Sequence, residues 1–249
     1  MTRIKAATSH FLISLALSTI VICLLIFGWY PRPYFWALGG LMLLVLIIGV
    51  DIVLGPLMTL LLFNPKKSRR ALALDLSIIA IVQISALGYG LYSGYASRLV
   101  FKVFDGKSFQ LVQAGDIPSN FLKRTALPEY QSLPFIGQRY AMVDVPDNDQ
   151  GRGDLAFFGA LGTGPQIMTQ YYVPLQQGRA QLTKASIAQS GLQKKHPALA
   201  AEVSSLLQDH QLSRDGAAVL PFEVKTRTYT AIVRLDPVEV LDVLPEDPR

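Results

Sequence analysis

The middle of the first hundred residues reads Gly49-Val50-Asp51-Ile52-Val53-Leu54-Gly55-Pro56-Leu57-Met58-Thr59, an apolar sequence interrupted by one carboxylate and a Gly-Pro step. It belongs to a longer apolar run from Phe35 to Phe63. A helix rises ~1.5 Å per residue and about 20 apolar residues cross a bilayer, so the run predicts a membrane span with Asp51 near its midplane. An ionisable side chain at that depth costs roughly a few kcal/mol or more, which makes a functional role the default hypothesis. A buried polar anchor between helices is the alternative that the sequence leaves open.

Gly55 and Pro56 predict a local kink in this span. Proline has no N–H, so in a regular helix it leaves the carbonyl of Ile52 without its donor. Glycine adds flexibility at the same place. Kinks of this kind are tolerated in a bilayer where neighbouring groups satisfy the freed backbone.

Two further apolar stretches predict two more spans, at residues 11–30 and 71–95. The first is followed by Trp29-Tyr30-Pro31-Arg32-Pro33 rather than by a small-residue cleavage site, so we expect a retained anchor and not a signal peptide. Gln83 lies near the middle of the third span, at a depth similar to that of Asp51. We therefore expect these two side chains to hydrogen-bond and the second and third helices to pack antiparallel.

The charges divide the chain into a three-helix membrane domain, residues 1–97, and a second domain, residues 98–249. Lys66, Lys67, Arg69 and Arg70 cluster in the loop after the second span, on the same side as Arg3 and Lys5, whereas only Arg32 lies in the other short loop. The positive-inside rule then predicts a cytoplasmic N-terminus and an anchoring cluster at 66–70 that is also cytoplasmic. Residues 98–249 would lie outside, in the periplasm of a Gram-negative cell.

The second domain carries 16 of the 23 basic and 16 of the 18 acidic residues, so it is neutral overall and offers no sign of a nucleic-acid partner. Alternating residues around Asp105-Gly106 predict a hairpin with a type I′ turn. We expect a helix over 179–190, another beginning at Pro197, a strand over 221–235 and a final strand over 238–244. The predicted fold class is a membrane α-helical part followed by an α+β domain with a mainly antiparallel sheet.

No catalytic, cofactor or metal motif is present. Gly159-Ala160-Leu161-Gly162-Thr163-Gly164 lacks the lysine and the spacing of a phosphate loop, Cys23 is the single cysteine, and the three histidines, His10, His196 and His210, are scattered. This argues against an enzyme and predicts no cofactor and no metal. Proton handling by Asp51 and a membrane-anchored sensor or ligand-binding protein are the competing function classes.

The sequence from Gly49 to Leu60, with Asp75–Gln83, Ala86–Gly90 and the Trp29-Tyr30-Pro31 turn, resembles the signature of type IV pilin accessory proteins, the TfpX/TfpZ-like group. The resemblance implies bacterial inner-membrane helices, a periplasmic region and a non-enzymatic role in assembling a cognate pilin into surface pili. The partners it implies are a type IV pilin subunit, other pilus assembly proteins and membrane lipids. It also implies a pilin helix with an N-terminal ammonium, which Asp51 could engage.

Overall fold

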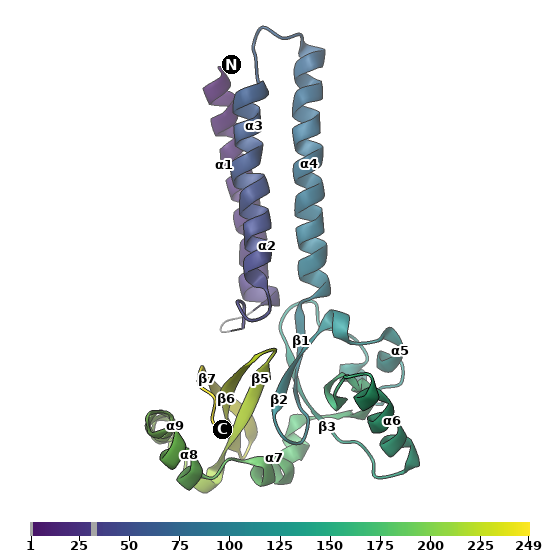
Figure 1. Cartoon of the computed structure of the whole chain (residues 1–249), viewed down its shortest axis with the longest axis vertical. Coiled ribbons are helices and arrows are strands. Elements are labelled where there is room, and N and C mark those ends of the chain that lie inside the picture. Colours follow the sequence, from purple (N-terminus) through teal and green to yellow (C-terminus); the bar gives the residue numbers. More distant parts are fainter. Residues whose placement is uncertain (1, 31–33) are drawn as a thin grey trace. The chain divides into compact units, whose positions relative to one another are not determined.

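The computed structural model of the chain describes residues 2–30 and 34–249, which divide into two compact units, residues 1–98 and residues 99–249 (Figure 1). The loop residues Pro31, Arg32 and Pro33, which enter the predicted turn and the charge comparison, lie outside the described residues.

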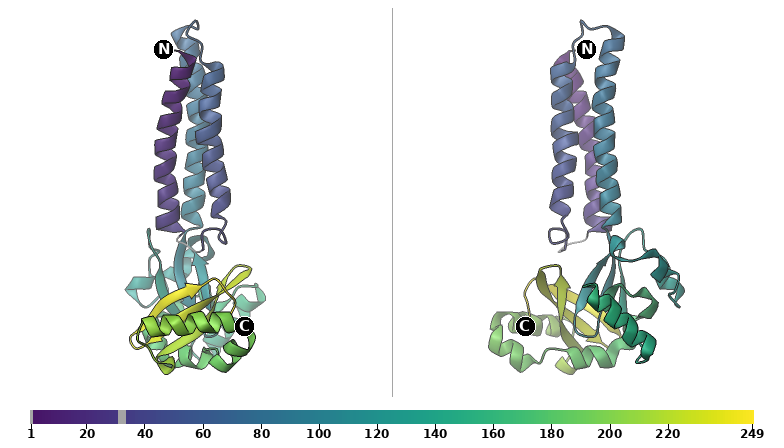
Figure 2. Two further views of the ribbon diagram at one scale, coloured as in Figure 1. Left: turned by 90° about the vertical axis from the view of Figure 1, so that its left-hand side faces the viewer. Right: turned by 45° about the vertical axis from the view of Figure 1, so that its right-hand side comes forward.

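The first unit consists of three long helical segments that lie side by side (Figures 1 and 2). Helix α1 spans Arg3–Cys23 and continues as the π-helical segment η1, Leu24–Trp29. The second segment is made of α2, Gly40–Ile47, the π-helical η2, Ile48–Leu54, and α3, Gly55–Leu62; α4 spans Arg69–Ala96. Within the described part of the chain, these segments of 27, 23 and 28 residues are each long and apolar enough to cross a membrane, which confirms the three apolar helices of the predicted fold class and is consistent with their predicted place in a membrane.

Polar side chains fix where these helices begin. The hydroxyl of Thr2 accepts from the backbone N–H of Lys5, and that of Ser68 accepts from Ala71, so α1 and α4 each start at a side-chain cap. Lys67 Nζ lies 2.5 Å from Asp75 Oδ2, in the second turn of α4. The remaining cations of the anchoring cluster, Lys66, Arg69 and Arg70, are exposed.

The second unit contains one seven-stranded sheet with the order β4-β3-β1-β2-β5-β6-β7. Its strands are β1 Leu99–Phe104, β2 Phe109–Gln113, β3 Arg139–Val143, β4 Tyr172–Val173, β5 Ala217–Val224, β6 Arg227–Leu235 and β7 Val238–Leu244. Its helices are α5 Ser119–Leu122, α6 Asp149–Ala160, α7 Arg179–Ala185, α8 Gln189–Lys195 and α9 Pro197–Asp209. Short 3-10 turns occur at Ala114–Asp116, Pro128–Tyr130, Pro165–Ile167, Thr169–Tyr171, Leu175–Gly178 and Arg214–Gly216.

The sheet is mixed, so the prediction of a mainly antiparallel sheet is wrong. β1 pairs in parallel with β3, and β2 pairs in parallel with β5. Both parallel pairs follow long connections, residues 114–138 and 174–216, that carry the chain back across the domain before the next strand begins. Local sequence patterns identify hairpins but carry little information on where such a long connection returns.

Three local predictions also need correction. The hairpin turn between β1 and β2 is not type I′, which needs two positive φ angles, because only Gly106 has one (+96°) and the Asp105 carboxylate instead accepts from the N–H groups of Lys107 and Ser108. The predicted strand over 221–235 is the hairpin β5–β6, and the predicted helix over 179–190 is broken into α7 and α8. The break occurs because Ile187 donates to the carbonyl of Val219 on β5.

Two hydrophobic clusters form the core of this unit. One gathers around Phe101, whose ring meets those of Tyr130 and Tyr172 edge to face. The other lies beneath α9, as expected for an amphipathic helix beginning at Pro197; Leu199 and Val203 pack toward β5–β7. Figure 2 shows α8 and α9 alongside these strands.

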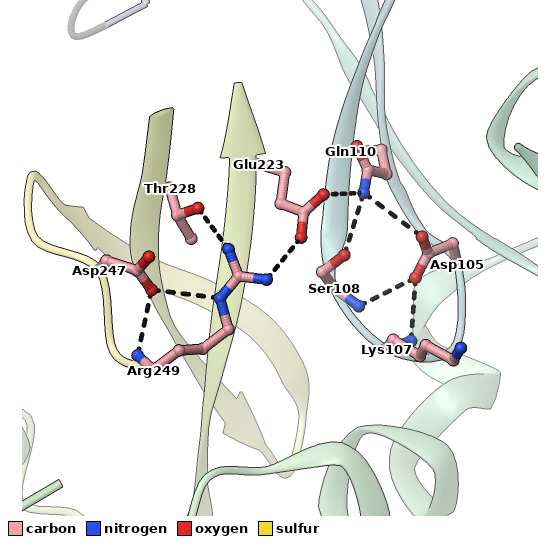
Figure 3. A network of polar contacts seen from close by, with 8 residues as sticks. All are labelled: Asp105, Lys107, Ser108, Gln110, Glu223, Thr228, Asp247 and Arg249. Atoms are coloured by element: carbon pink, nitrogen blue, oxygen red, sulfur yellow. Dashed lines mark hydrogen bonds and ion pairs between the residues drawn. The ribbon is translucent and has the colours of Figure 1, made fainter. Parts of the chain in front are cut away.

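The two parts of the sheet meet at a short joint between β2 and β5. Only Phe109 with Phe222 and Gln110 with Glu223 are paired there, and the two phenylalanine rings stack with centroids 5.7 Å apart. Gln110 donates to Glu223 at 2.8 Å, and Glu223 also pairs with Arg249 at 3.1 Å (Figure 3). This polar network closes over the joint on its exposed side.

Candidate functional site

Five polar side chains from all three helical segments of the first unit gather between them. They are His10 and Ser14 on α1, Asp51 on η2, Thr59 on α3 and Gln83 on α4. Asp51, Thr59 and Ser14 are only 5%, 2% and 6% exposed. In helices made mostly of apolar residues, this cluster is the candidate functional site, since polar groups inside membrane spans are costly and tend to be functional.

Gln83 contacts three other members of the cluster through its side-chain amide. Its Oε1 accepts from His10 Nε2 at 2.7 Å, and its Nε2 donates to the main-chain carbonyl of Asp51 at 3.2 Å and lies 3.4 Å from Ser14 Oγ. The amide lies directly over Gly55, where a Cβ atom would come within 2.1 Å of Nε2. A glycine at position 55 is therefore what lets α4 place this amide against the second segment.

The π-helical segment explains why the main-chain carbonyl of Asp51 is available to accept a hydrogen bond from Gln83. In η2 the N–H of Gly55 bonds to the carbonyl of Val50, five residues earlier. By the same spacing the carbonyl of Asp51 would need the N–H of residue 56, but Pro56 has none. Gln83 supplies the missing donor from α4. The predicted disturbance at Gly55-Pro56 thus takes the form of a π-helical turn whose free carbonyl is satisfied from a neighbouring helix, as a bilayer requires.

The Asp51 carboxylate makes no hydrogen bond to any residue that the structure describes. The contact between Asp51 and Gln83 runs through the main chain instead. The carboxylate lines a small cavity of about 130 Å³ together with His10, Ser14 and Gln83. The other lining residues are apolar and come from α1 and α4; they are Ile13, Leu17, Ala80, Ile84 and Leu87.

His10 joins the cluster through both ring nitrogens. Nδ1 lies 2.5 Å from Thr59 Oγ1, and Thr59 Oγ1 lies 3.1 Å from the carbonyl of Gly55. Gln83 Oε1 can only accept, so His10 Nε2 donates to it. The Thr59 hydroxyl can either donate to Nδ1 or accept from it.

Sequence reasoning placed Asp51, Gln83, Gly55 and Pro56 in this region but missed His10, Ser14 and Thr59. A usable signal existed in α1. Ala6, His10, Ser14 and Ser18 recur every four residues, which puts small and polar side chains on one helical face. The cations at 66–70 are not part of the cluster.

Known proteins are similar to this chain over most of its length. The family model described as Fimbrial assembly protein FimB matches residues 1–39. Over 236 residues, the chain is 33% identical to the fimbrial assembly protein of serogroup I from Dichelobacter nodosus, covering 93% of this chain and 90% of that one. The chain belongs to the fimbrial assembly protein family. This confirms the resemblance to a pilus accessory family that residues 49–60 indicated.

Two further members of the family are similar at different lengths. The fimbrial assembly protein of serogroup E1 from the same organism is 32% identical with the same coverage. The protein of serogroups C1 and C2 is 40% identical over 113 residues, which is 45% of this chain and 86% of that protein. No solved structure matches the chain. The family model covers the part of α1 that supplies His10 and Ser14.

Proposed function

We propose that this protein assists a cognate type IV pilin subunit in its assembly into surface pili, acting from the bacterial inner membrane and without catalysing a reaction. The observation that carries the proposal is the similarity to fimbrial assembly proteins over 93% of the chain, which takes in most of both units. Its partners are then the pilin, other pilus assembly proteins and membrane lipids.

The charge distribution supports an orientation for this role. Lys66, Lys67, Arg69 and Arg70 flank the start of α4, and Arg3 and Lys5 lie in the first turn of α1. By the positive-inside rule both ends face the cytoplasm. Residues 99–249 are then periplasmic, where they can contact the head of a pilin subunit.

We propose that the contact within the membrane is made at Asp51. A carboxylate without a hydrogen-bonding partner inside a bundle of membrane helices gains most from a cationic group. The cavity in front of it is edged by Ile13 on α1 and Ile84 on α4, which are 62% and 70% exposed. A partner helix reaching this seam from the lipid could bring its N-terminal ammonium to Asp51.

Complementation of a deletion strain tests the proposal. Without the gene, surface pili should be lost while pilin is still made. Asp51→Asn keeps hydrogen bonding and removes the charge, whereas Asp51→Leu removes both. If Asp51 binds an ammonium, both variants should reduce sheared surface pili while the protein stays at its normal level. If Asp51 is a structural anchor, Asn should be nearly silent and Leu should lower the amount of folded protein.

Ser18→Ala is the matched control, because the Ser18 hydroxyl is buried one turn from Ser14 and has no hydrogen-bonding partner among the described residues. It should leave piliation unchanged. Full piliation with Leu at position 51 would refute both roles for Asp51. Full piliation of the deletion strain itself would refute the proposed function.

One observation favours a second candidate, proton handling. His10 lies between Thr59 and Gln83 beside Asp51, so the cluster holds a base and an acid within the membrane part. Purified protein in liposomes with an imposed pH gradient distinguishes the candidates. Proton flux that depends on both His10 and Asp51 would favour proton handling, and absence of flux with intact piliation would favour the accessory role.

A further inference from the structure

A short loop in the second unit exposes two large apolar side chains. Phe135 and Ile136 are 59% and 58% exposed, in the segment just before β3. The base of the loop is held in place: the guanidinium of Arg139 donates to the carbonyls of Glu129 and Ser132. Gly137, at φ +78°, provides the turn that leads into β3. The exposed pair is thus presented on an ordered loop.

Sheet register fixes which end of the domain this loop occupies. β3 runs parallel to β1, with Arg139 beside Phe101. Arg139 is the first residue of β3 and Phe101 is only two residues after Leu99, so both strands begin at the same edge of the sheet, and the loop leads into β3 at that edge. Leu99 is also where the chain enters the domain, three residues after α4 ends at Ala96. If α4 crosses a bilayer, the loop lies at the end of the domain that is tethered to the bilayer surface.

We propose that Phe135 and Ile136 insert into the headgroup region of the membrane and form a second, non-covalent attachment of this domain. The segment from Gln131 to Gln138 contains no charged residue, so no ion loses its hydration when the tip enters. Aromatic and aliphatic side chains at such a level gain from leaving water. The inference depends on the proposed membrane insertion of α4 and not on the pilus role.

Another exposed apolar pair in the same unit provides a contrast. Phe157 and Leu161, at the end of α6, are 61% and 62% exposed. However, α6 follows the opposite end of β3 and carries Arg152 and Asp154. Exposure alone therefore predicts equal lipid contact for both pairs, whereas the sheet register predicts contact for the loop only.

Fluorescent labelling of the full chain in nanodiscs of phosphatidylethanolamine and phosphatidylglycerol tests the inference. In a Cys23→Ser background, an environment-sensitive probe is attached to Ile136→Cys, to Phe157→Cys as the matched control, and to Ile84→Cys as a reference on α4. We expect the probe at 136 to emit at shorter wavelength and to be quenched most by lipids that carry a nitroxide on the headgroup. The probe at 157 should behave as in water.

Each other result is decisive. A probe at 136 that matches the one at 157, in water or in lipid, overturns the inference. A probe that emits at shorter wavelength without quenching by lipid nitroxide overturns it too, since protein would then cover the loop; so does shielding that appears only when pilin is added. Quenching at 84 by nitroxide on the acyl chain tests α4 insertion separately, so its failure identifies a failure of the membrane proposal.

Discussion

Replacing Gly55 by alanine should separate the second helical segment from α4. The added Cβ atom would lie 2.1 Å from Gln83 Nε2 and 2.5 Å from Cδ, so the amide must swing away. In doing so it gives up its bonds to His10, at 2.7 Å, and to the Asp51 carbonyl, at 3.2 Å. That carbonyl has no other donor available, because Pro56 has no N–H.

The magnitude follows from these losses. Interhelical hydrogen bonds in membranes contribute about 0.6 kcal/mol on average and about 1.7 kcal/mol at most. A buried carbonyl left unpaired costs about 1–3 kcal/mol. Replacing glycine in a helix interior returns about 1 kcal/mol. The net loss in free energy of unfolding should be about 2 kcal/mol.

The assay is SDS titration of the full chain in mixed micelles, followed by tryptophan fluorescence. The two tryptophans, Trp29 and Trp36, both belong to the first unit, and Trp29 is buried against Tyr95 with ring centroids 5.8 Å apart. Gly49→Ala is the matched control, since a Cβ atom there would meet nothing within 4 Å. It should be neutral or slightly stabilising.

The double variant Gly55→Ala, Gln83→Ala tests whether the cost of Gly55→Ala comes from displacing the Gln83 amide. In a Gln83→Ala background there is no amide to displace, so Gly55→Ala should cost nothing further. If Gly55→Ala destabilises equally with and without Gln83, the cost comes from elsewhere and the proposed role of Gly55 is wrong. A cost no larger than that of Gly49→Ala would refute it as well.

Three further predictions concern topology and the second unit. Alkaline phosphatase fused after Leu111 should be active and after Lys67 inactive, and the reverse pattern would refute the proposed orientation. The fragment Leu99–Arg249 should be soluble and unfold in one cooperative thermal transition, because it has its own core; aggregation under mild conditions would contradict this. Burial raises the pKa of Tyr130 and of Tyr140 from 10.0 to about 12, so both phenols keep their protons longer in the folded fragment than in the unfolded chain. The stabilisation that comes from these two raised pKa values is fully present below pH 10 and is lost as the pH rises toward 12. Denaturant titrations of the fragment at several pH values would detect this fall in the free energy of unfolding.

The helices of the first unit were predictable because their signal is strong. About 20 apolar residues in succession have few other stable arrangements, and the mid-span positions of Asp51 and Gln83 follow from counting residues. The π-helical segments were not predictable, because the sequence around Pro56 fits an ordinary kink equally well. His10 was overlooked because its neighbours Arg3 and Lys5 associate it with the basic N-terminus, although its four-residue spacing to Ser14 places it on the inward face.

In the second unit, the sequence predicted individual helices and strands better than it predicted which strands pair. The final strand and the helix beginning at Pro197 follow from alternation and from a proline at a first helical position. The break between α7 and α8 depends on Ile187 reaching the open edge of β5 at Val219, a contact between residues far apart in sequence. The parallel pairing of β1 with β3 depends in the same way on how a long connection returns.

The π-helical η2 segment has a consequence for how the second membrane segment meets its neighbours. Each residue of a regular helix advances about 100° around the axis, and a π turn accommodates one residue more than a regular turn. The segment therefore rotates the face of the helix that follows it. α2, which precedes the segment, packs against α4, whereas α3, which follows it, packs chiefly against α1. Deleting one residue from 48–54 would remove this rotation, turn Thr59 away from His10 and leave the membrane span long enough but wrongly facing.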